Sequence, residues 1–377
     1  MTGTNFTSSE ISSQPRLWME TYKAVLNAKD QLLCFLNEKY AINELQIILT
    51  GAGSSAFIGE ILQYSFEKNC GIPIKAIPTT DLVTHPTNFF KKTKPTLLVS
   101  FARSGDSPES VATYELAEKF CCFSYHLIIS CNPEGELVKM ASGKKNSFIF
   151  LLPEEANDQG LAMTSSFTTM ELAGLLISDL KNIERKEKSV KKLMELGEII
   201  LEQYDSKLME LAKMDFKRIV FLGSGPLKGT ARESHLKVIE LTDGQIICQY
   251  DSFLGFRHGP KAIIDETTLL VYLFSTDPCV HKYERDLVRS INDTEKFLFS
   301  VGIGQCSTKF DNLNLNLNIN FCAGDVMMGD DYYSICSVMP AQIIGFYKSL
   351  FLGLTPDSPS KNGGINRIVQ GVTIYPY

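Results

Sequence analysis

The sequence predicts an α/β protein that contains two copies of one fold, each built around a parallel sheet. Two observations predict this: short apolar strands alternate with helical segments, and the whole pattern restarts after a helical stretch in mid-chain. A chain of 377 residues is long enough for two domains of ordinary size. We expect an N-terminal helical segment over 1–40, a first domain with a helical connector over 41–205, and a second domain over 206–377.

The first copy follows a helical segment over 14–40 and opens with an apolar run that ends at Gly51-Ala52-Gly53. Hydroxyl residues and a helical pattern come next, which is typical of a strand, a tight turn and a helix N-terminus. The same order of strand, turn and helix recurs along the chain, in the stretches 73–83, 96–120, 126–141 and 148–177.

A charged stretch over 181–214 then reads as a helical connector with a solvated face. The strand pattern restarts at Arg218, and Gly51 matches Gly223 at an offset of 223 − 51 = 172 residues. Two further stretches keep nearly the same offset: the strand from residue 97 matches the one from 270, and 81–86 matches the region of 253–260. Three landmarks in one register predict an internal duplication. Residues 311–317 alternate between polar and apolar types and are expected to form an exposed or edge strand.

Composition limits the partners and the compartment. The net charge of −6 argues against a nucleic-acid partner, since such proteins usually carry a basic patch. The ten cysteines form no C-x-x-C pair, which predicts buried free thiols in a reducing compartment and no zinc site. The N-terminus has no signal-peptide pattern, and no run reaches the roughly 18 apolar residues of a membrane span. We therefore expect a cytoplasmic protein with no membrane partner.

Two loops have the composition of anion sites. Gly53, Ser54 and Ser55 join a strand to a helix N-terminus, which attracts an anion. The glycine pattern is not that of a dinucleotide site and no P-loop lysine follows. Ser104 and Ser107 leave a second strand and enter a helix, with Arg103 as a charged clamp. Helix capping alone also explains both loops. A third hydroxyl cluster has two interpretations: Thr164 or Ser166 caps a helix, or Thr164 and Ser165 approach a ligand.

Two further features are candidates for proton transfer. Glu233, Lys237 and Glu240 are spaced i, i+4 and i+7, so they share one face of a predicted helix. A solvated charge stripe is the ordinary explanation, whereas a carboxylate facing a cleft can move protons between sugar carbons. His258 lies in a loop beside Arg257, where a histidine can donate a proton near neutral pH, although most loop histidines do no chemistry.

Taken together, these segments resemble the sugar isomerase (SIS) superfamily and, within it, the tagatose-6-phosphate ketose/aldose isomerase family, also described as D-galactosamine-6-phosphate deaminases. The resemblance spans nearly the whole chain. It implies two SIS domains, each a five-stranded parallel sheet flanked by helices, with a sugar phosphate on the first copy and no cofactor or metal. The segments that carry it are GAGSSAFIGE, PTTDLVT, SFARSGDSPESV, LGSG, ARESHLKVIELTDG, FRHGPK and TPDSPSKNGGINRIVQGVTIYP.

The resemblance also implies roles for single residues. Glu240 matches the proton-transferring glutamate of the related glucosamine-6-phosphate synthase. Lys237 matches the lysine that stands three residues before that glutamate in the synthase. His258 matches a histidine that opens the sugar ring and comes from a neighbouring subunit, which implies a homodimer or a higher homo-oligomer. The remaining matches are substrate-binding positions: Gly53, Ser54, Ser55, Arg103, Ser104, Ser107, Leu161, Ala162 and Gln370.

Three departures from the synthase narrow the expected reaction. Gln370 stands where the synthase has a lysine, so no Schiff base forms there, and it stays open whether Gln370 or Arg367 takes over that role. Ala102 replaces a phosphate-loop serine. The chain begins Met1-Thr2, without the N-terminal cysteine of a glutaminase domain, which favours release of ammonia over its incorporation.

The expected function is conversion of D-galactosamine 6-phosphate and water to D-tagatose 6-phosphate and ammonia. Two alternatives remain: isomerisation of a non-amino sugar phosphate, and a non-catalytic regulator that binds a sugar phosphate. Assays that measure ammonia and ketose separately distinguish deamination from isomerisation of a non-amino sugar phosphate, whereas a regulator binds its ligand without turnover. An isomerase of envelope synthesis is disfavoured by the whole-chain pattern.

Overall fold

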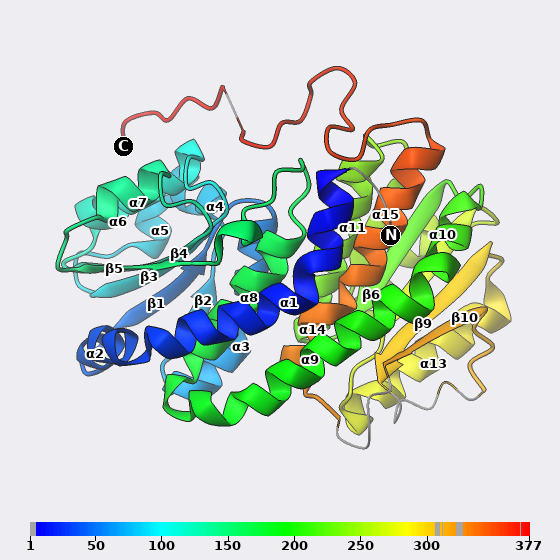
Figure 1. Cartoon of the computed structure of the whole chain (residues 1–377), viewed down its shortest axis with the longest axis horizontal. Coiled ribbons are helices and arrows are strands. Elements are labelled where there is room, and N and C mark those ends of the chain that lie inside the picture. Colours follow the sequence, from blue (N-terminus) through cyan, green and yellow to red (C-terminus); the bar gives the residue numbers. More distant parts are fainter. Residues whose placement is uncertain (1–4, 306–309, 311, 322–326, 370) are drawn as a thin grey trace. The chain divides into compact units, whose positions relative to one another are not determined.

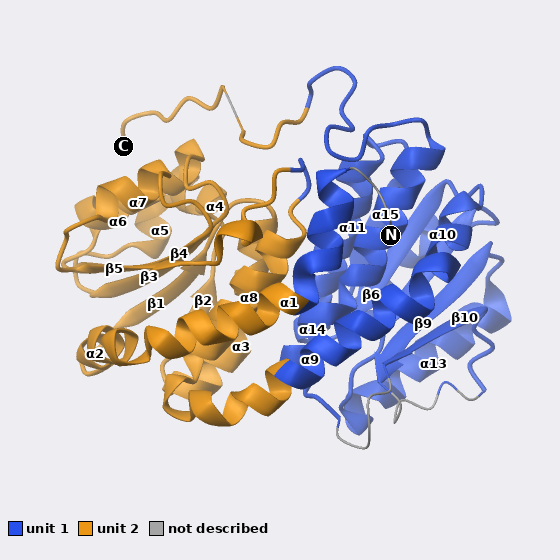
Figure 2. Cartoon of the chain, in the orientation of Figure 1, with its two compact units in different colours: residues 1–15, 160–162, 191–364 blue, residues 16–159, 163–190, 365–377 orange. Residues whose placement is uncertain are grey.

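The computed structural model describes residues 5–305, 310, 312–321, 327–369 and 371–377 (Figure 1). The chain divides into two compact units, coloured separately in Figure 2. Unit 2 comprises residues 16–159, 163–190 and 365–377, and unit 1 comprises 1–15, 160–162 and 191–364. Each unit is therefore assembled from three separate stretches of chain.

Unit 2 contains a five-stranded parallel sheet in the order β2-β1-β3-β4-β5. Its strands are β1 (Gln46–Thr50), β2 (Ile74–Ala76), β3 (Thr96–Ala102), β4 (Ser124–Ser130) and β5 (Ser147–Leu151). Its helices are α2 (Lys29–Tyr40), α3 (Ser54–Cys70), α4 (Thr79–Thr84), α5 (Pro86–Phe89), α6 (Pro108–Phe120), α7 (Glu136–Ala141), η1 (Glu154–Ala156), α8 (Ser165–Ser178) and η2 (Leu180–Lys186). Helices α1 (Phe6–Asn27) and α9 (Glu187–Ile199) contribute residues to both units.

Unit 1 contains a second five-stranded parallel sheet, in the order β10-β9-β8-β6-β7. Its strands are β6 (Arg218–Gly223), β7 (Ile247–Asp251), β8 (Thr268–Leu273), β9 (Phe299–Gln305) and β10 (Leu317–Phe321). Its helices are η3 (Ile200–Tyr204), α10 (Asp205–Lys213), α11 (Pro226–Leu241), α12 (Phe253–Phe256), η4 (Pro260–Ile263), α13 (Pro278–Thr294), α14 (Asp330–Ser337) and α15 (Met339–Phe351).

The two sheets confirm the predicted α/β class and the duplication. Counted from the first strand of each unit, both sheets have the order 2-1-3-4-5. The strands also keep the offset read from the sequence, since β6 and β1 start 218 − 46 = 172 residues apart and β8 and β3 start 268 − 96 = 172 residues apart. In such sheets, ligands bind at the carboxyl ends of the strands, where the strand order reverses.

Burial explains why the central strands read as continuous apolar runs. Every residue of β3 and of β8 is buried, because helices cover both faces of each sheet. In unit 2, α3 and α8 cover one face and α4 and α6 cover the other (Figure 1). Gly174 of α8 permits the close packing, since a Cβ there would lie 2.5 Å from Leu62 of α3 and 3.0 Å from Phe101 of β3. The carboxyl ends of the strands are thus fixed by a rigid core.

Two sequence predictions need correction. The expected strand over 311–317 starts only at Leu317, because Asn312 and Asn314 have positive φ angles in a turn; residue 311 lies outside the described residues. The cysteines within the described residues are free thiols, but Cys34, Cys122 and Cys279 are exposed, contrary to the expected burial. Cys306 and Cys322 lie outside the described residues.

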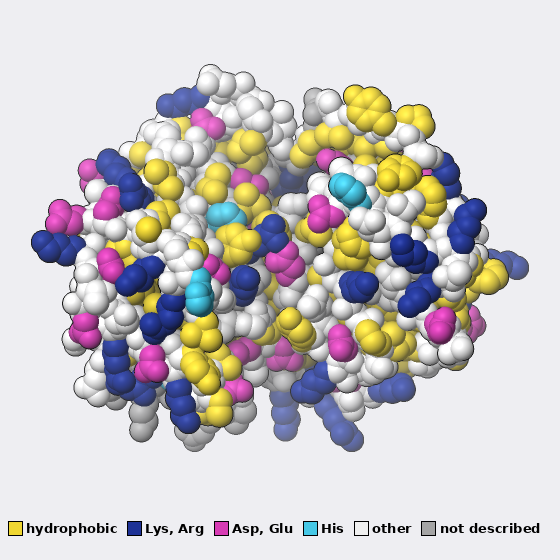
Figure 3. Space-filling model, turned by 180° about the vertical axis from the view of Figure 1, so that it is seen from behind, with side chains coloured by type: hydrophobic (Ala, Val, Ile, Leu, Met, Phe, Trp, Pro, Cys, Tyr) yellow, Lys and Arg dark blue, Asp and Glu magenta, His cyan; other side chains and the backbone are white. Residues whose placement is uncertain are grey.

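The charge on the surface and the apolar character of the helices are the features that concern nucleic-acid and membrane partners. On the face shown in Figure 3, basic and acidic side chains are interspersed, with no field of a single sign. Among the described residues, no helix combines the length and the apolar character that crossing a membrane requires.

Candidate functional site

The first candidate loop is a strand-to-helix turn that recurs in both units. Gly53 adopts φ 57° and ψ −129° immediately before α3, and Gly225 adopts φ 56° and ψ −128° before α11. These angles favour glycine, which explains the residue type at both positions. Ser54 and Ser55 form the first turn of α3 and are 4% and 5% exposed. The turn therefore presents a helix N-terminus at the carboxyl end of β1.

The second candidate loop, between β3 and α6, is held in shape by the loop that follows β4. The side-chain amide of Asn132 donates to the carbonyl of Ser104 at 2.8 Å, and the Ser104 hydroxyl accepts the N–H of Asp106 at 3.2 Å. Gly105 has φ 75° and lies so close to Gly135 that a Cβ would come within 3.3 Å of the Gly135 Cα. The loop is thus preorganised by backbone and side-chain contacts.

Ser107 occupies the N-cap position of α6, but its side chain makes no capping bond to the helix backbone. Its hydroxyl instead donates to the hydroxyl of Ser110 at 2.6 Å. Pro108 starts the helix with a preset φ angle. The positive end of a 13-residue helix therefore faces this loop with two hydroxyl groups beside it, an arrangement suited to an anion.

The third hydroxyl cluster is organised by Asp158, a residue that sequence reasoning missed. This fully buried carboxylate accepts hydrogen bonds from the backbone N–H groups and the hydroxyls of Thr164, Ser165 and Ser166, over 2.5–3.3 Å. The expectation that a Thr164 or Ser166 side chain caps α8 is wrong, because Asp158 performs the capping. The hydroxyls of Thr164 and Ser165 accordingly donate to this carboxylate. The acidic residue six positions before Thr164 was the available signal.

Arg103 contacts the C-terminal segment of its own unit. Its Nη2 donates to the carbonyl of Arg367 at 2.5 Å, and its residue exposure is 8%. The Arg367 guanidinium donates to the carbonyl of Asp158 at 2.7 Å and to the side chain of Asn157 at 2.8 Å. Burial raises the pKa of the nearby Cys131 thiol; Asp158 adds to that rise, while the two arginines oppose it. Arg367 is therefore engaged with the loop after β5.

Of the three remaining predicted substrate-binding positions, the structure describes two. Leu161 belongs to unit 1, and its N–H donates to the carbonyl of Asp357 at 3.0 Å. Ala162, in the same short stretch, is fully buried. Gln370 lies outside the described residues.

The charged face of α11 is buried, so the interpretation of a solvated stripe is wrong. Glu233 and Lys237 have no exposed side-chain surface, and the Glu240 side chain is 23% exposed. The Lys237 ammonium lies 3.1 Å from a carboxylate oxygen of Glu233 and 2.6 Å from one of Glu240. Burial alone would lower the pKa of Lys237, but the two carboxylates outweigh it and raise that pKa. Lys237 is thus a fixed cation that orients the Glu240 carboxylate.

His258 lies on an exposed loop of unit 1. Helix α12 ends at Phe256, and both Arg257 and His258 are exposed. The His258 N–H donates to the carbonyl of Gly255 at 3.0 Å, and Gly259 follows with φ 122°. The imidazole is therefore presented on the surface of its own unit.

In the second copy, the loop that corresponds to the Ser104–Ser107 loop is already contacted by carboxylates of the protein. Asp277 caps α13 by accepting the N–H groups of Cys279 and Val280. Asp330 accepts the Thr276 N–H at 2.7 Å and the Ser275 hydroxyl at 2.5 Å. Carboxylates of the protein thus occupy the donors that would bind a phosphate in this copy.

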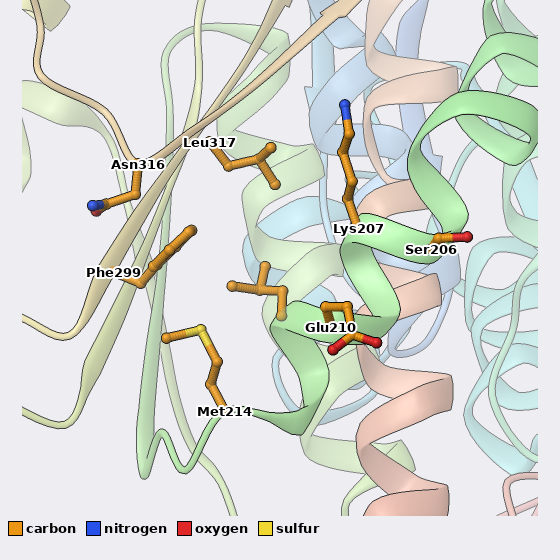
Figure 4. A pocket seen from close by; sticks show the side chains of 8 residues that line it. Ser206, Lys207, Glu210, Met214, Phe299, Asn316 and Leu317 are labelled. Atoms are coloured by element: carbon orange, nitrogen blue, oxygen red, sulfur yellow. The ribbon is translucent and has the colours of Figure 1, made fainter.

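A pocket of about 390 Å³ in unit 1 lies away from these loops. In Figure 4, Phe299, Leu317 and Met214 point toward its interior, while Lys207 points away. Phe299 and Leu317 are the first residues of β9 and β10, so the pocket lies at the amino ends of the strands. Within the described ranges, no group of three or more acidic, histidine or cysteine side chains is arranged to hold a metal ion.

Two parallel sheets of order 2-1-3-4-5, with a hydroxyl-rich helix N-terminus in one copy and a buried Glu-Lys-Glu cluster in the other, define a tandem sugar isomerase (SIS) protein. No model of a known protein family matches the chain. The chain is 36% identical to the D-galactosamine-6-phosphate deaminase AgaS of Shewanella sp. strain ANA-3, over 100% of its own length and 93% of that protein.

Solved structures show the same relationship. A tagatose-6-phosphate ketose/aldose isomerase from Escherichia coli matches with a TM-score of 0.90 and 37% identity, over 99% of this chain and 97% of that one. A Clostridium novyi protein provisionally assigned the same activity matches with a TM-score of 0.95 and 41% identity, over 99% of this chain and 95% of that one. The chain belongs to the AgaS D-galactosamine-6-phosphate deaminase/tagatose-6-phosphate isomerase family.

Proposed function

We propose that this enzyme converts D-galactosamine 6-phosphate and water to D-tagatose 6-phosphate and ammonia. The observation that carries the proposal is the buried cluster on α11, in which Lys237 orients the partly exposed carboxylate of Glu240. A fixed, hydrogen-bonded carboxylate suits proton transfer between neighbouring carbons. Full-length similarity to a protein named for this reaction supports the choice of substrate.

Phosphate binding is assigned to the loops of unit 2. The N–H groups of Gly53, Ser54 and Ser55 and the hydroxyls of Ser104 and Ser107 bind the phosphate oxygens, because helix N-termini and hydroxyls provide the required donors. Four other positions are proposed as substrate contacts: Arg103 supplies positive charge, Leu161 and Ala162 supply backbone contacts, and Gln370 is included because it matches the position of the synthase lysine.

The chemistry is proton transfer followed by hydrolysis. His258 protonates the ring oxygen and the ring opens to the aldehyde. Glu240 removes the proton from C2, giving an enolamine, and the proton is returned to C1. The resulting imine at C2 is hydrolysed by one water to the ketone and ammonia. Protons removed in one step are returned in the next, so no external oxidant or reductant is needed.

The proposal includes a homodimer or a higher homo-oligomer in the cytoplasm. His258 is exposed on its own unit, so it is available to the active site of a second copy. The free thiols among the described cysteines suit a reducing compartment.

The test replaces Glu240 by glutamine, which keeps the size of the side chain and removes its basicity. We expect Glu240→Gln to lower the rate of ammonia release by about 10²–10⁴-fold while D-galactosamine 6-phosphate still binds. The matched control is Glu210→Gln, at an exposed position of α10. An ammonia-release rate equal to that of the unmodified enzyme in the Glu240 variant would refute the assignment.

The competing activity is isomerisation of a non-amino sugar phosphate, which the name of the Escherichia coli structure favours. A panel of amino and neutral hexose 6-phosphates, with ammonia and ketose measured separately, distinguishes the two. Ketose formation from neutral substrates without ammonia from amino substrates would favour the competitor.

A further inference from the structure

Each unit is hollowed at the same place, beside the helix that precedes its first strand. In unit 1 this is the pocket of about 390 Å³ beside α10 (Figure 4), and in unit 2 it is a groove of about 490 Å³ beside α2. We call them the unit 1 pocket and the unit 2 groove. The duplication repeats this feature, because lining residues match in pairs at the offset of 172, as 206 − 34 = 172 shows. Such pairs are Cys34 and Ser206, Glu38 and Glu210, and Lys39 and Leu211.

The register of the sheets identifies the equivalent residue of the fourth strand. Tyr125 of β4 pairs with Leu97 of β3 in unit 2. Leu269 of β8 stands 269 − 97 = 172 positions after Leu97, and it pairs with Phe299 of β9. Phe299, which lines the unit 1 pocket, is therefore the equivalent of Tyr125.

The fifth strands follow in the same register. Leu127 of β4 pairs with Phe148 of β5 in unit 2. Val301 is the equivalent of Leu127, since both stand two residues after the position fixed above, and Val301 pairs with Leu317 of β10. Leu317, a second lining residue of the unit 1 pocket, is therefore the equivalent of Phe148.

The two copies differ in the side chain that covers these strand positions. In unit 2 the Phe35 ring packs on the Phe148 ring with centroids 5.7 Å apart, and Phe35 is 9% exposed. The residues that line the unit 2 groove include Phe35 but neither Tyr125 nor Phe148. In unit 1 the equivalent position, 35 + 172 = 207, is an exposed lysine. Its ammonium lies 4.9 Å from the centroid of the Tyr204 ring, and in Figure 4 the Lys207 side chain points away from the pocket.

The unit 1 pocket therefore lies where the other copy holds an aromatic ring. Phe299, Leu317 and Met214 point into it, and Leu211, which also lines it, is buried. Such walls suit an aromatic guest, because rings pack edge to face or offset on other rings and a methionine sulfur contacts ring edges favourably. The volume is sufficient, since an apolar cavity of about 150 Å³ can hold benzene.

We infer that the unit 1 pocket binds a small neutral molecule with one aromatic ring, in the place that the Phe35 ring takes in unit 2. The charge of Glu210, which lines the pocket, is already paired with Lys213 at 2.5 Å. A charged ligand would lose hydration in an apolar pocket without gaining a partner, which is why the ligand is neutral. The inference does not rest on the proposed function, because the pocket lies at the amino ends of the strands and the proposed phosphate loops lie at the carboxyl ends.

Toluene is the probe, because it has the carbon skeleton of a phenylalanine side chain. The full chain is labelled with ¹³C at the methionine methyl groups and titrated with toluene by nuclear magnetic resonance. We expect a saturable shift of the Met214 signal and no shift of Met140, a methionine of unit 2 that is also partly buried. No shift at Met214, or equal unsaturable shifts at both methionines, would overturn the inference.

Two substitutions of the same lysine separate the space from the side chain. Lys207→Phe restores the ring of the other copy, so it should fill the pocket and weaken toluene binding by about 10-fold or more. Lys207→Ala leaves the pocket empty and should keep the affinity within about 2-fold of the unmodified chain. Equal affinities in Lys207→Phe and the unmodified chain, or equal losses in the two variants, would overturn the inference.

The matched control is Lys282→Phe, which adds the same ring at an exposed position of α13 in unit 1. It should bind toluene as the unmodified chain does, and a loss equal to that of Lys207→Phe would contradict the assignment to the pocket. The rate of ammonia release should be unchanged in Lys207→Phe. Failure of toluene to bind would leave the proposed enzyme intact, and wild-type ammonia release in Glu240→Gln would leave the pocket intact, so the two proposals fail separately.

Discussion

Lys237 shows how a single residue departs from its ordinary behaviour. A lysine side chain is rarely fully buried, and here two carboxylates of its own helix compensate its charge. The i, i+4 and i+7 spacing predicted that the three side chains share a face. Their burial was not predictable, because it depends on what packs over α11. Gly345 of α15 supplies that packing, since a Cβ there would lie 3.4 Å from the Lys237 carbonyl and 2.8 Å from Leu241.

Removing this cation should be costly. We expect Lys237→Met to lower the free energy of unfolding by about 3–5 kcal/mol, because it leaves the Glu233 carboxylate buried without its cation. Urea denaturation measures the change. Lys228→Met, at an exposed position of the same helix, should change the stability by less than about 0.5 kcal/mol. Equal losses in the two variants would contradict this account.

Asp158 makes a separate prediction at the same scale. Replacing it with alanine leaves the N-terminal donors of a fully buried helix without their acceptor. We expect Asp158→Ala to lower the free energy of unfolding by about 2 kcal/mol or more. Glu154→Gln, an exposed acidic residue in η1, is the control. A thermal midpoint unchanged in Asp158→Ala would show that α8 is capped by other groups.

At the scale of elements, β4 and α6 are joined by a buried histidine. His126 of β4 is fully buried, bonds the Glu118 carboxylate at 2.9 Å and stacks on Tyr114 with ring centroids 3.8 Å apart. Burial lowers the pKa of His126 to about 4, even though Glu118 acts in the opposite direction. Burial alone would raise the pKa of Glu118, but hydrogen bonds from Ser124 and His126 lower it overall.

This pair predicts a loss of stability in mild acid. The unfolded chain protonates His126 below about pH 6.5, whereas the folded chain keeps it neutral down to about pH 4, so the unfolded state binds the extra proton. The free energy of unfolding should therefore fall by up to about 3 kcal/mol between pH 6.5 and 4.

Urea denaturation as a function of pH measures that loss. His126→Gln should remove most of the dependence, while His85→Gln, at an exposed position, should preserve it. An identical pH slope in His126→Gln and the unmodified chain would contradict the assignment.

The sequence predicted elements better than it predicted their ends. The alternation of strands and helices and its repetition followed from the sequence, because apolar runs and glycine turns are local signals. The anchoring of Arg367 was missed because its partner Asp158 lies 209 positions away in the sequence. The cap on α8 was missed although Asp158 lies only six positions before Thr164, because the sequence does not show which acidic side chain turns toward a helix N-terminus. Gln370 and Arg367 illustrate the limit, since both were weighed for the same role and only Arg367 lies within the described residues.

At the scale of the whole molecule, the start and the end of unit 1 are bonded to each other. Asp357 accepts the N–H groups of Phe6 and Thr7 at 3.0 and 2.8 Å and the Thr7 hydroxyl at 2.7 Å. A residue 350 positions away in sequence thus caps the first helix. Gln14 adds a second such link, through a side-chain bond of 2.8 Å to Gln342.

This distant cap can be tested by substitution. Asp357→Ala should cost about 1–2 kcal/mol of unfolding free energy and should speed hydrogen exchange in the first turn of α1. Asp293→Ala, at an exposed position of α13, is the control. Protected amides in the first turn of the Asp357 variant would show that other groups cap the helix.

Each unit takes its residues from three separate stretches of the chain, and this has a consequence for cutting and rejoining the polypeptide. A single nick in mid-chain yields two fragments, and each keeps a terminal piece that belongs to the partner fragment's unit. Co-expressed halves should therefore recover a native fold only by exchanging these ends, whereas either half made alone would leave a sheet without one of its flanking segments. A circularly permuted chain that begins inside the connector should fold only if residues 1–15 still reach unit 1 and residues 365–377 still reach unit 2.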